Sequence, residues 1–440
     1  MADYKQIKPD LDFVKGVMKS GGDTVNRCYQ CATCSVVCPL STEESPFPRK
    51  EMLWTQWGLA GKVSGDVDVW LCHQCGDCSK YCPRDAKPGD VLGAIRANAI
   101  RYYSEPKALA DLLSTPGGVV GAVIAAMVVV LVVAAIWSNV TGEAFPFPEG
   151  DVVYHKFLSV IPIDAMYLSL VAFVAFISYK GVVNFWKDIS EGVGISESYT
   201  GTLPKPSIGD FVSKYLVPSF IEIIKHDRFK KCGQTAERAK GHQWLLISFI
   251  ILFVVTNFVF IAEDIFHALL HVIGPVTPMP QYHPVKIIAN IGAIMLIAGI
   301  FLIKSMRDQK TKEGVLQSSA QDWILIWLIF AVGATGIGAE VFRLINVAPI
   351  AYSVYVLHLG CVAILFLSLP YTKFGHLIYR TTAYVFQKWA DDVRAEKAGF
   401  GMEKEVGAVT EEAAEVDTEE KVETEAEAEA EKEVEAEKAK

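Results

Sequence analysis

The stretches "CYQCATCSVVCP", residues 28–39, and "CHQCGDCSKYCP", residues 72–83, carry the same pattern of cysteines. In each stretch the four cysteines are separated by two, two and three residues, and a proline follows the last one. Together they hold eight of the ten cysteines in this chain of 440 residues. Thiols repeated at one close spacing indicate a metal site in each copy.

The spacing C-x2-C-x2-C-x3-C-P is typical of [4Fe–4S] sites of the bacterial ferredoxin type. Three close thiolates bind three corners of one cube, and the fourth, before the proline, binds the other cube. Crossed ligation predicts one set of Cys28, Cys31, Cys34 and Cys82, and a second set of Cys72, Cys75, Cys78 and Cys38. Zinc knuckles usually pair two C-x2-C units, and disulfides suit a reducing compartment badly, so both alternatives are less favoured.

The rest of the chain is rich in apolar residues, which make up 51% of the whole sequence. Six long apolar runs lie at about 118–137, 157–179, 243–265, 284–303, 322–342 and 349–371. Each approaches the ~20 residues that a helix needs to cross a bilayer. A buried core helix is the alternative for a single run, but six runs favour a membrane domain. We therefore expect a mostly α fold, with a helical ferredoxin-type two-cluster domain followed by a six-helix transmembrane bundle.

Charge and composition divide the chain into residues 1–114, 115–395 and 396–440. The formal charge of −9 comes from the end of the sequence, where residues 403–440 hold 16 acidic and five basic side chains. This low-complexity tail is expected to solubilise the chain or to dock on a partner. The remainder is nearly neutral and has no large basic patch, which excludes a nucleic-acid partner.

Loop charges predict the orientation in the membrane. Lysine and arginine are frequent in the connections 180–242 and 304–321 and rare in 138–156, 266–283 and 343–348. Cytoplasmic loops concentrate positive residues, so both termini are expected on the cytoplasmic side of the inner membrane. The first residues also lack the apolar stretch of a signal peptide.

Histidines in or beside the apolar runs suggest a haem b site, because haem iron takes axial imidazoles and a histidine inside a span is usually functional. His358 and His376 are 18 residues apart, five helical turns, and are expected on one face of the last helix, ~27 Å apart. His242 opens the third run from the cytoplasmic side and is predicted to share a haem with His376. His267 is the preferred partner of His358 at the opposite surface. The alternatives are His271, His283 and His155.

The residues also resemble known families. "DVWLCHQCGDCSKYCP" resembles the ferredoxin-like, two-cluster polypeptide of heterodisulfide reductase. "RAKGHQWLLISFIILFVV" and the last helix resemble the haem b membrane subunits of that reductase and of respiratory nitrate reductase. The fusion of both parts, over roughly 28–110 and 240–390, is similar to the membrane subunits of the quinone-interacting membrane-bound oxidoreductases of sulfate reducers.

This resemblance implies menaquinol as reductant, flavin- and iron–sulfur-containing cytoplasmic subunits of the same complex as partners, and adenylylsulfate reductase as the downstream acceptor. The nitrate reductase pattern has a second haem ligand ten residues after the position of His242, where this chain has Leu252. The expected cofactors are therefore two [4Fe–4S] clusters, one or two haems b and menaquinone.

The predicted function is that of a membrane-anchored electron-transfer subunit, because no acid–base or nucleophile constellation indicates a self-contained enzyme. One alternative is a non-catalytic anchor and assembly scaffold whose membrane part holds no cofactor. Another is a quinone-reducing subunit of the heterodisulfide reductase type, since the sequence does not determine the direction of electron flow.

Overall fold

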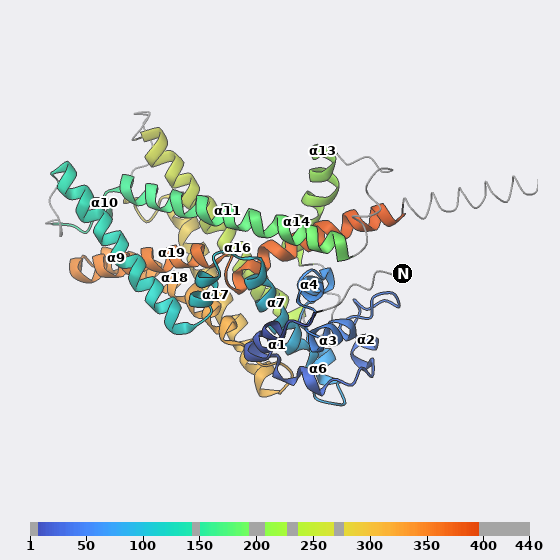
Figure 1. The fold of residues 1–440 in the computed structure, drawn as a ribbon. Coiled ribbons are helices and arrows are strands. Elements are labelled where there is room, and N and C mark those ends of the chain that lie inside the picture. Colours follow the sequence, from blue (N-terminus) through green and yellow to red (C-terminus); the bar gives the residue numbers. More distant parts are fainter. Residues whose placement is uncertain (1–7, 143–149, 193–206, 227–235, 268–276, 396–440) are drawn as a thin grey trace, which may run out of the picture. The chain divides into compact units, whose positions relative to one another are not determined.

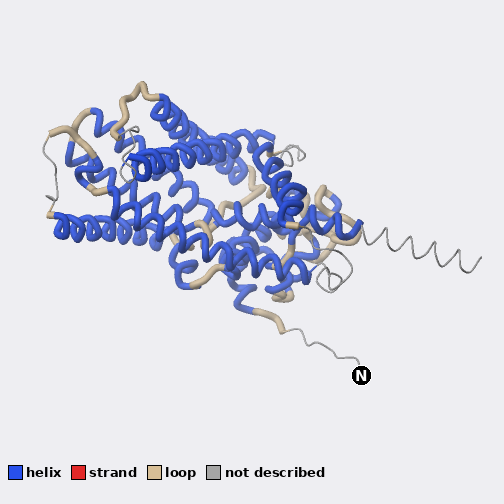
Figure 2. The backbone as a smooth tube through the Cα atoms, turned by 90° about the horizontal axis from the view of Figure 1, so that it is seen from above, coloured by secondary structure: helices blue, strands red, loops and turns tan. Residues whose placement is uncertain are grey.

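The computed structural model describes residues 8–142, 150–192, 207–226, 236–267 and 277–395. This part of the chain consists of helices and connecting loops and contains no strand (Figure 2). The described residues up to 192 and from 207 to 385 belong to one compact unit, and 386–395 belong to a second. The first unit holds both cysteine stretches and all six apolar runs, and the expected mostly α fold is confirmed.

The N-terminal domain is built from short helices around the two cysteine loops (Figure 1). They are α1 (Leu11–Val17), η1 (Met18–Gly22), η2 (Asp23–Arg27), α2 (Thr33–Val36), α3 (Arg49–Gln56), α4 (Ala60–Ser64), α5 (Val67–Leu71), α6 (Asp77–Lys80), α7 (Pro88–Tyr103) and α8 (Lys107–Leu113). The longest, α7, begins with a proline at its first turn, where the missing amide hydrogen is tolerated. Its buried face carries Val91, Leu92 and Ile95 and forms the centre of the domain.

Among the described residues, six helices are long and apolar enough to cross a membrane. They are α9 (Pro116–Thr141), α11 (Val160–Gly192), α16 (Ala236–Val259), α17 (Pro284–Lys312), α18 (Ala320–Leu344) and α19 (Ala348–Ser368). The remaining elements are α10 (Tyr154–Phe157), α13 (Ile208–Asp210), η3 (Phe211–Leu216), α14 (Val217–Lys225), η5 (Phe260–His267) and η6 (Lys373–Gly375). Every apolar run of the sequence therefore contains a helix, and the prediction of six candidate spans is confirmed.

Local signals explain where these helices begin and end. Thr115 caps α9 by accepting a hydrogen bond from the Gly118 amide at 3.1 Å, and Gly142, at φ 75°, ends it. Ser319 and Asp322 form a reciprocal capping box at the start of α18. These caps satisfy backbone amides that have no partner inside their own helix.

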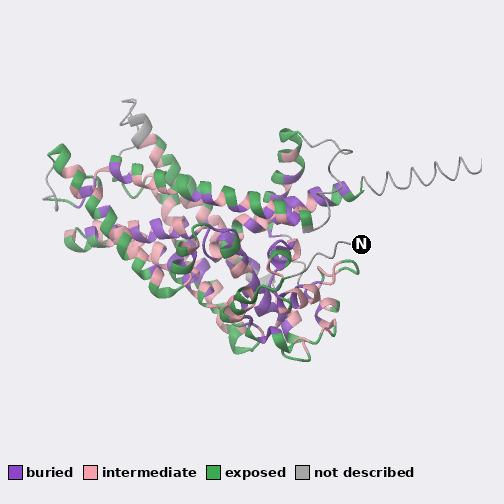
Figure 3. Ribbon diagram, viewed as in Figure 1, coloured by how far each residue is buried: buried purple, intermediate pink, exposed green. Residues whose placement is uncertain are grey.

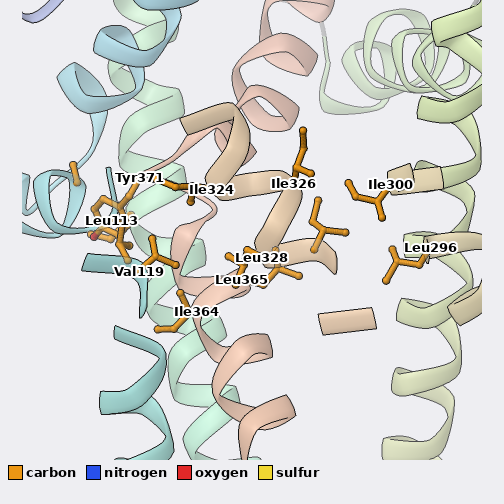
Figure 4. Close-up of a cluster of buried hydrophobic side chains, with 13 residues drawn as sticks. Leu113, Val119, Leu296, Ile300, Ile324, Ile326, Leu328, Ile364, Leu365 and Tyr371 are labelled. Carbon is orange, nitrogen blue, oxygen red and sulfur yellow. The ribbon is translucent and has the colours of Figure 1, made fainter. Parts of the chain in front are cut away.

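The bundle is held by neighbouring pairs of helices: α16 packs on α17, α17 on α18, α18 on α19, and α19 on α9. Glycines allow close approach, because a Cβ on Gly299 of α17 would lie 3.0 Å from the Leu245 amide nitrogen of α16. Buried side chains from several helices, among them Leu296, Ile326 and Leu365, meet in one apolar cluster (Figure 4). Exposed residues run along the outward faces of the spans (Figure 3), as expected of surfaces that contact lipid.

The prediction that His358 and His376 lie on one helix is wrong. α19 ends at Ser368, and η6 separates it from a new helical segment at 376–395. Pro370 has no amide hydrogen and its ring clashes with the preceding turn, so a regular helix does not continue through it. The predicted run 349–371 therefore ends three residues too late, and the expectation of five uninterrupted turns between the two histidines fails.

Within the first unit, the N-terminal domain contacts the helical bundle through hydrogen bonds. Lys310 Nζ, near the end of α17, donates to the carbonyl of Cys75 at 2.8 Å. The Tyr103 hydroxyl of α7 donates to Asp188 of α11 at 2.9 Å. The second cysteine stretch therefore lies against the end of the bundle at which α17 ends and α18 begins.

Candidate functional site

The first cluster site consists of Cys28, Cys31, Cys34 and Cys82, which line one small cavity. Ala32, at φ 67°, turns the backbone immediately before α2, so Cys28 and Cys31 lie on a tight loop and Cys34 lies in the first turn of that helix. The fourth cysteine belongs to the other stretch, and its thiol interacts electrostatically with those of Cys28 and Cys34.

The second cluster site has the same construction with the stretches exchanged. Gly76, at φ 96°, turns the loop before α6. The Cys78 thiol interacts with those of Cys72, Cys75 and Cys38, the last from the first stretch. The structure thus brings together the two sets of four cysteines that crossed ligation predicts.

Burial disfavours the charged form of these thiols. It raises the pKa of Cys34 to about 11 and that of Cys78 well above its ordinary value, and neighbouring thiolates add to the effect. Iron binds the thiolate, so these groups lose their protons at neutral pH only beside a positive partner such as iron. The described cysteines form no disulfide. This donor set fits iron–sulfur clusters.

The imidazole rings of His242 and His376 lie close together, with their centroids 6.3 Å apart and their planes at 73°. His242 lies in the second turn of α16, and His376 begins the helical segment after η6. Two imidazoles that bind opposite sides of one metal ion, each with a metal–nitrogen bond of ~2 Å, have ring centres roughly 6 Å apart. The separation of the two ring centres therefore matches the separation that a shared metal ion requires.

Hydrogen bonds orient both rings for such a role. His376 Nδ1 donates to the Lys373 carbonyl at 2.6 Å. His242 Nδ1 lies 2.8 Å from His226 Nε2, and His226 Nδ1 lies 3.0 Å from the Ile224 carbonyl. Because a carbonyl only accepts, a neutral His226 carries its hydrogen on Nδ1 and accepts from His242 at Nε2. This network places the lone pair of both predicted ligands on Nε2, which suits metal binding.

Burial also lowers the pKa of His376 to about 4, so its ring is neutral at physiological pH. A neutral imidazole is the form that binds a metal.

His358 lies in a different environment, packed against α18. Its Nδ1 is 3.0 Å from the Thr335 hydroxyl, and a Cβ on Gly336 would lie 3.0 Å from its ring. Among the described side chains, none of the histidine ring contacts involves His358. His267 ends η5, and its side chain lies outside the described residues. The pairing of these two histidines stays a prediction.

Other positions weighed for a second site have other surroundings. Leu252 packs against Gly292 of α17, so apolar contact fills the position at which the nitrate reductase pattern has a ligand. His283 precedes α17, and its Nδ1 is buried without a hydrogen-bond partner among the described residues.

A single arginine connects the second cluster site to the predicted haem ligand. Arg380 lies one turn after His376 in the same helical segment. Its Nη2 donates to His73 Nδ1 at 2.8 Å, and His73 directly follows Cys72. The loop that holds the second cluster site therefore lies beside the segment that carries His376.

Sequence reasoning missed His226, which is 3% exposed and ends α14 in the left-handed conformation. It was overlooked because it lies in a basic loop outside every apolar run. A signal was present, since apolar residues at helical spacing precede it: Ile208, Val212, Leu216, Phe220 and Ile221.

Comparisons with known proteins match both parts of the chain. The family model described as "Citrate utilization protein B" matches residues 122–399, and that of a "4Fe-4S dicluster domain" matches residues 24–86. A curated relative, Citrate utilization protein B of Escherichia coli, is 24% identical over 315 residues, which cover 70% of this chain and 75% of that protein. No solved structure matches.

Proposed function

Because this chain belongs to the Citrate utilization protein B family and carries a 4Fe-4S dicluster domain before the matched region, we propose that it transfers electrons between the quinone pool of a membrane and cytoplasmic redox partners. The two [4Fe–4S] clusters form the cytoplasmic end of this path, and the six apolar helices place the other end in the bilayer. Loop charges put both termini on the cytoplasmic side.

One observation carries the proposal: two oriented imidazoles, His242 and His376, lie 6.3 Å apart beside the loop of the second cluster site. A haem b held there would supply one-electron transfer inside the bilayer boundary. His242 and His376 would hold it through Nε2, and their Nδ1 hydrogen bonds leave the lone pair of each ring on that atom. An anchor without a membrane cofactor has no use for such an arrangement.

The direction of flow and the identity of the partners are narrower proposals. The resemblance to quinone-interacting oxidoreductases supports menaquinol as donor, flavin-containing subunits as partners and adenylylsulfate reductase as acceptor. The family match supports a second candidate, because the curated relative is named for citrate utilization. In that case a flavoprotein of carboxylate metabolism would reduce the clusters, and quinone would be the acceptor.

The test replaces a single predicted ligand. His376→Ala is expected to remove the low-spin bis-imidazole haem spectrum and to abolish cluster reduction by a menaquinol analogue. Chemical reduction of the clusters by dithionite should survive, since the eight cysteines are untouched. Optical and paramagnetic resonance spectra of the purified full-length protein provide both readouts.

His358→Ala is the matched control, because it removes a histidine that hydrogen-bonds Thr335 and lies apart from the 242–376 pair. It should leave the spectrum of that haem unchanged. If His376→Ala keeps the full haem content and an unaltered low-spin spectrum, His242 and His376 do not hold the haem together. Absence of any haem from the wild-type protein would favour the anchor instead.

A further inference from the structure

A cavity of about 70 Å³ lies between the N-terminal domain and the start of α18. Its wall includes Trp70 of α5, Asp90 of α7, Gln321 of α18 and His376. A dry cavity that binds benzene measures ~150 Å³, whereas one water in the liquid takes up ~30 Å³. The space therefore has room for about two water molecules.

The polar atoms of the wall point to water as the occupant. Among the described residues, Trp70 Nε1, Asp90 Oδ2 and Gln321 Oε1 are buried and have no hydrogen-bond partner, and all three residues line this cavity. They comprise one donor and two acceptors. Buried water typically makes about three hydrogen bonds to such groups, so the cavity has the lining that an internal water needs.

Asp90 is the titratable group among the three. It lies in the first turn of α7, and its Oδ1 accepts from the Gln317 amide at 3.0 Å. Burial raises its pKa to about 6, against the opposing effect of that hydrogen bond and of Lys87. The other charged or titratable groups around it are Asp23, Asp85 and Arg307, and across the cavity Arg96, Asp322, Lys373 and His376.

Asp90 also lies near the second cluster site. The preceding residue, Gly89, donates its amide to Ser79 Oγ at 3.0 Å, and a Cβ on it would lie 3.7 Å from Cys78 Sγ. An electron added ~10 Å from a carboxyl, at an effective dielectric constant of ~20, raises its proton affinity roughly tenfold. The residue before Asp90 lies against Cys78, so the carboxyl lies within the range over which the charge on that cluster acts.

We propose that this cavity is a hydrated proton site, in which Asp90 binds a proton when the second cluster is reduced and releases it when the cluster is oxidised. The cluster gains one electron from its donor, and the carboxylate takes one proton from cavity water. Bulk solvent then returns a proton to that water. Oxidation reverses both transfers. The inference rests on the proposed function only in requiring a redox-active cluster at the second site.

The experiment is mediated redox titration of the full-length protein across a range of pH, with both clusters followed by electron paramagnetic resonance. The pKa of Asp90 is higher with the cluster reduced, so protons are taken up between the oxidised-state and reduced-state pKa values. In that window the potential of the second cluster should fall as pH rises, and it should be level on either side. Asp90→Asn keeps the oxygen that accepts from Gln317 and should make the potential independent of pH there.

Asp12→Asn is the matched control, since the Asp12 side chain is 97% exposed on α1, and it should behave as wild type. As a readout that needs no variant, the reduced-minus-oxidised infrared spectrum of the wild type should show the carbonyl band of a protonated carboxyl. A level wild-type profile, or a slope that persists in Asp90→Asn, overturns the proposal. Chemical mediators set the potential, so failure of quinol-dependent transfer would leave this result readable.

Discussion

His226 offers a sensitive test of the histidine site, because it touches a predicted ligand without being one. In the neutral form its Nε2 accepts a hydrogen bond from His242 Nδ1 at 2.8 Å, and the Ile224 carbonyl fixes its own tautomer. His226→Phe keeps a ring of similar size and removes the acceptor. His226→Gln is the control, since its side-chain oxygen can still accept.

The expected magnitude follows from the lost hydrogen bond. A neutral hydrogen bond contributes about 1 kcal/mol net, and loss of a group that orients a ligand typically weakens metal binding ~10–100-fold. Ferric iron draws more electron density from the imidazole than ferrous iron, so the bond is stronger in the oxidised state. If most of ~1 kcal/mol falls on that state, the haem potential in His226→Phe rises by ~40 mV, because a tenfold change in a one-electron equilibrium is ~59 mV.

The assay is a redox titration of the haem band in purified protein, together with low-temperature paramagnetic resonance of the ferric state. The phenylalanine variant should keep a low-spin haem with a raised potential and altered g values, and the glutamine variant should lie closer to wild type. A phenylalanine variant with full haem content and unchanged potential would refute the orienting role of His226. If the haem potential shifts equally in both variants, the cause is a change in packing and not the loss of the hydrogen bond.

Two further predictions concern the N-terminal domain. Cys38→Ser is expected to damage the cluster held mainly by the second stretch, and Cys82→Ser is expected to damage the cluster held mainly by the first. Paramagnetic resonance with the two cluster signals resolved is the measurement. Loss of the cluster held by the mutated stretch itself, in both variants, would contradict crossed ligation. Lys50 lies among Glu51, Asp66 and Asp68, so Lys50→Met should lower the free energy of unfolding by about 3–5 kcal/mol. Burial raises the pKa of the Glu51 and Asp66 carboxyls, which therefore become neutral as pH falls. The Lys50→Met variant should then lose less free energy of unfolding at acidic than at alkaline pH, as measured by denaturant-induced bleaching of the clusters.

The wider setting of the site depends on which redox partners meet the N-terminal domain. Its second cysteine stretch lies against the bundle through Lys310 and Arg380, whereas the first cluster site includes the exposed Cys31. The two sites therefore differ in exposure: the second lies against the helical bundle, and the first contains an exposed cysteine. This asymmetry suits a chain that passes electrons from one side to the other.

Local sequence alone determined much of this protein. The six apolar runs became six helices because length and hydrophobicity need no tertiary context to make a span. The cysteine spacing likewise predicted the two sets of thiols that the structure brings together, since a tight loop with a fixed period restricts what its side chains can bind. The ends of helices are harder to predict from sequence: the apolar run 349–371 extends through Pro370, whereas α19 stops at Ser368.

Tertiary structure decided the features that depend on distant segments meeting. The ring of His376 lies near that of His242, 134 positions earlier, only because a break after α19 redirects the chain. His226 reaches the same place from the end of α14, a segment that lies outside the six apolar runs. Trp70, Asp90 and Gln321 look ordinary in the sequence and become a hydrated site only where α5, α7 and α18 enclose a cavity. Spacing along the chain reports local geometry, whereas burial and hydrogen bonding arise only when elements pack. The chemistry of the histidine pair and of the cavity depends on burial and hydrogen bonding.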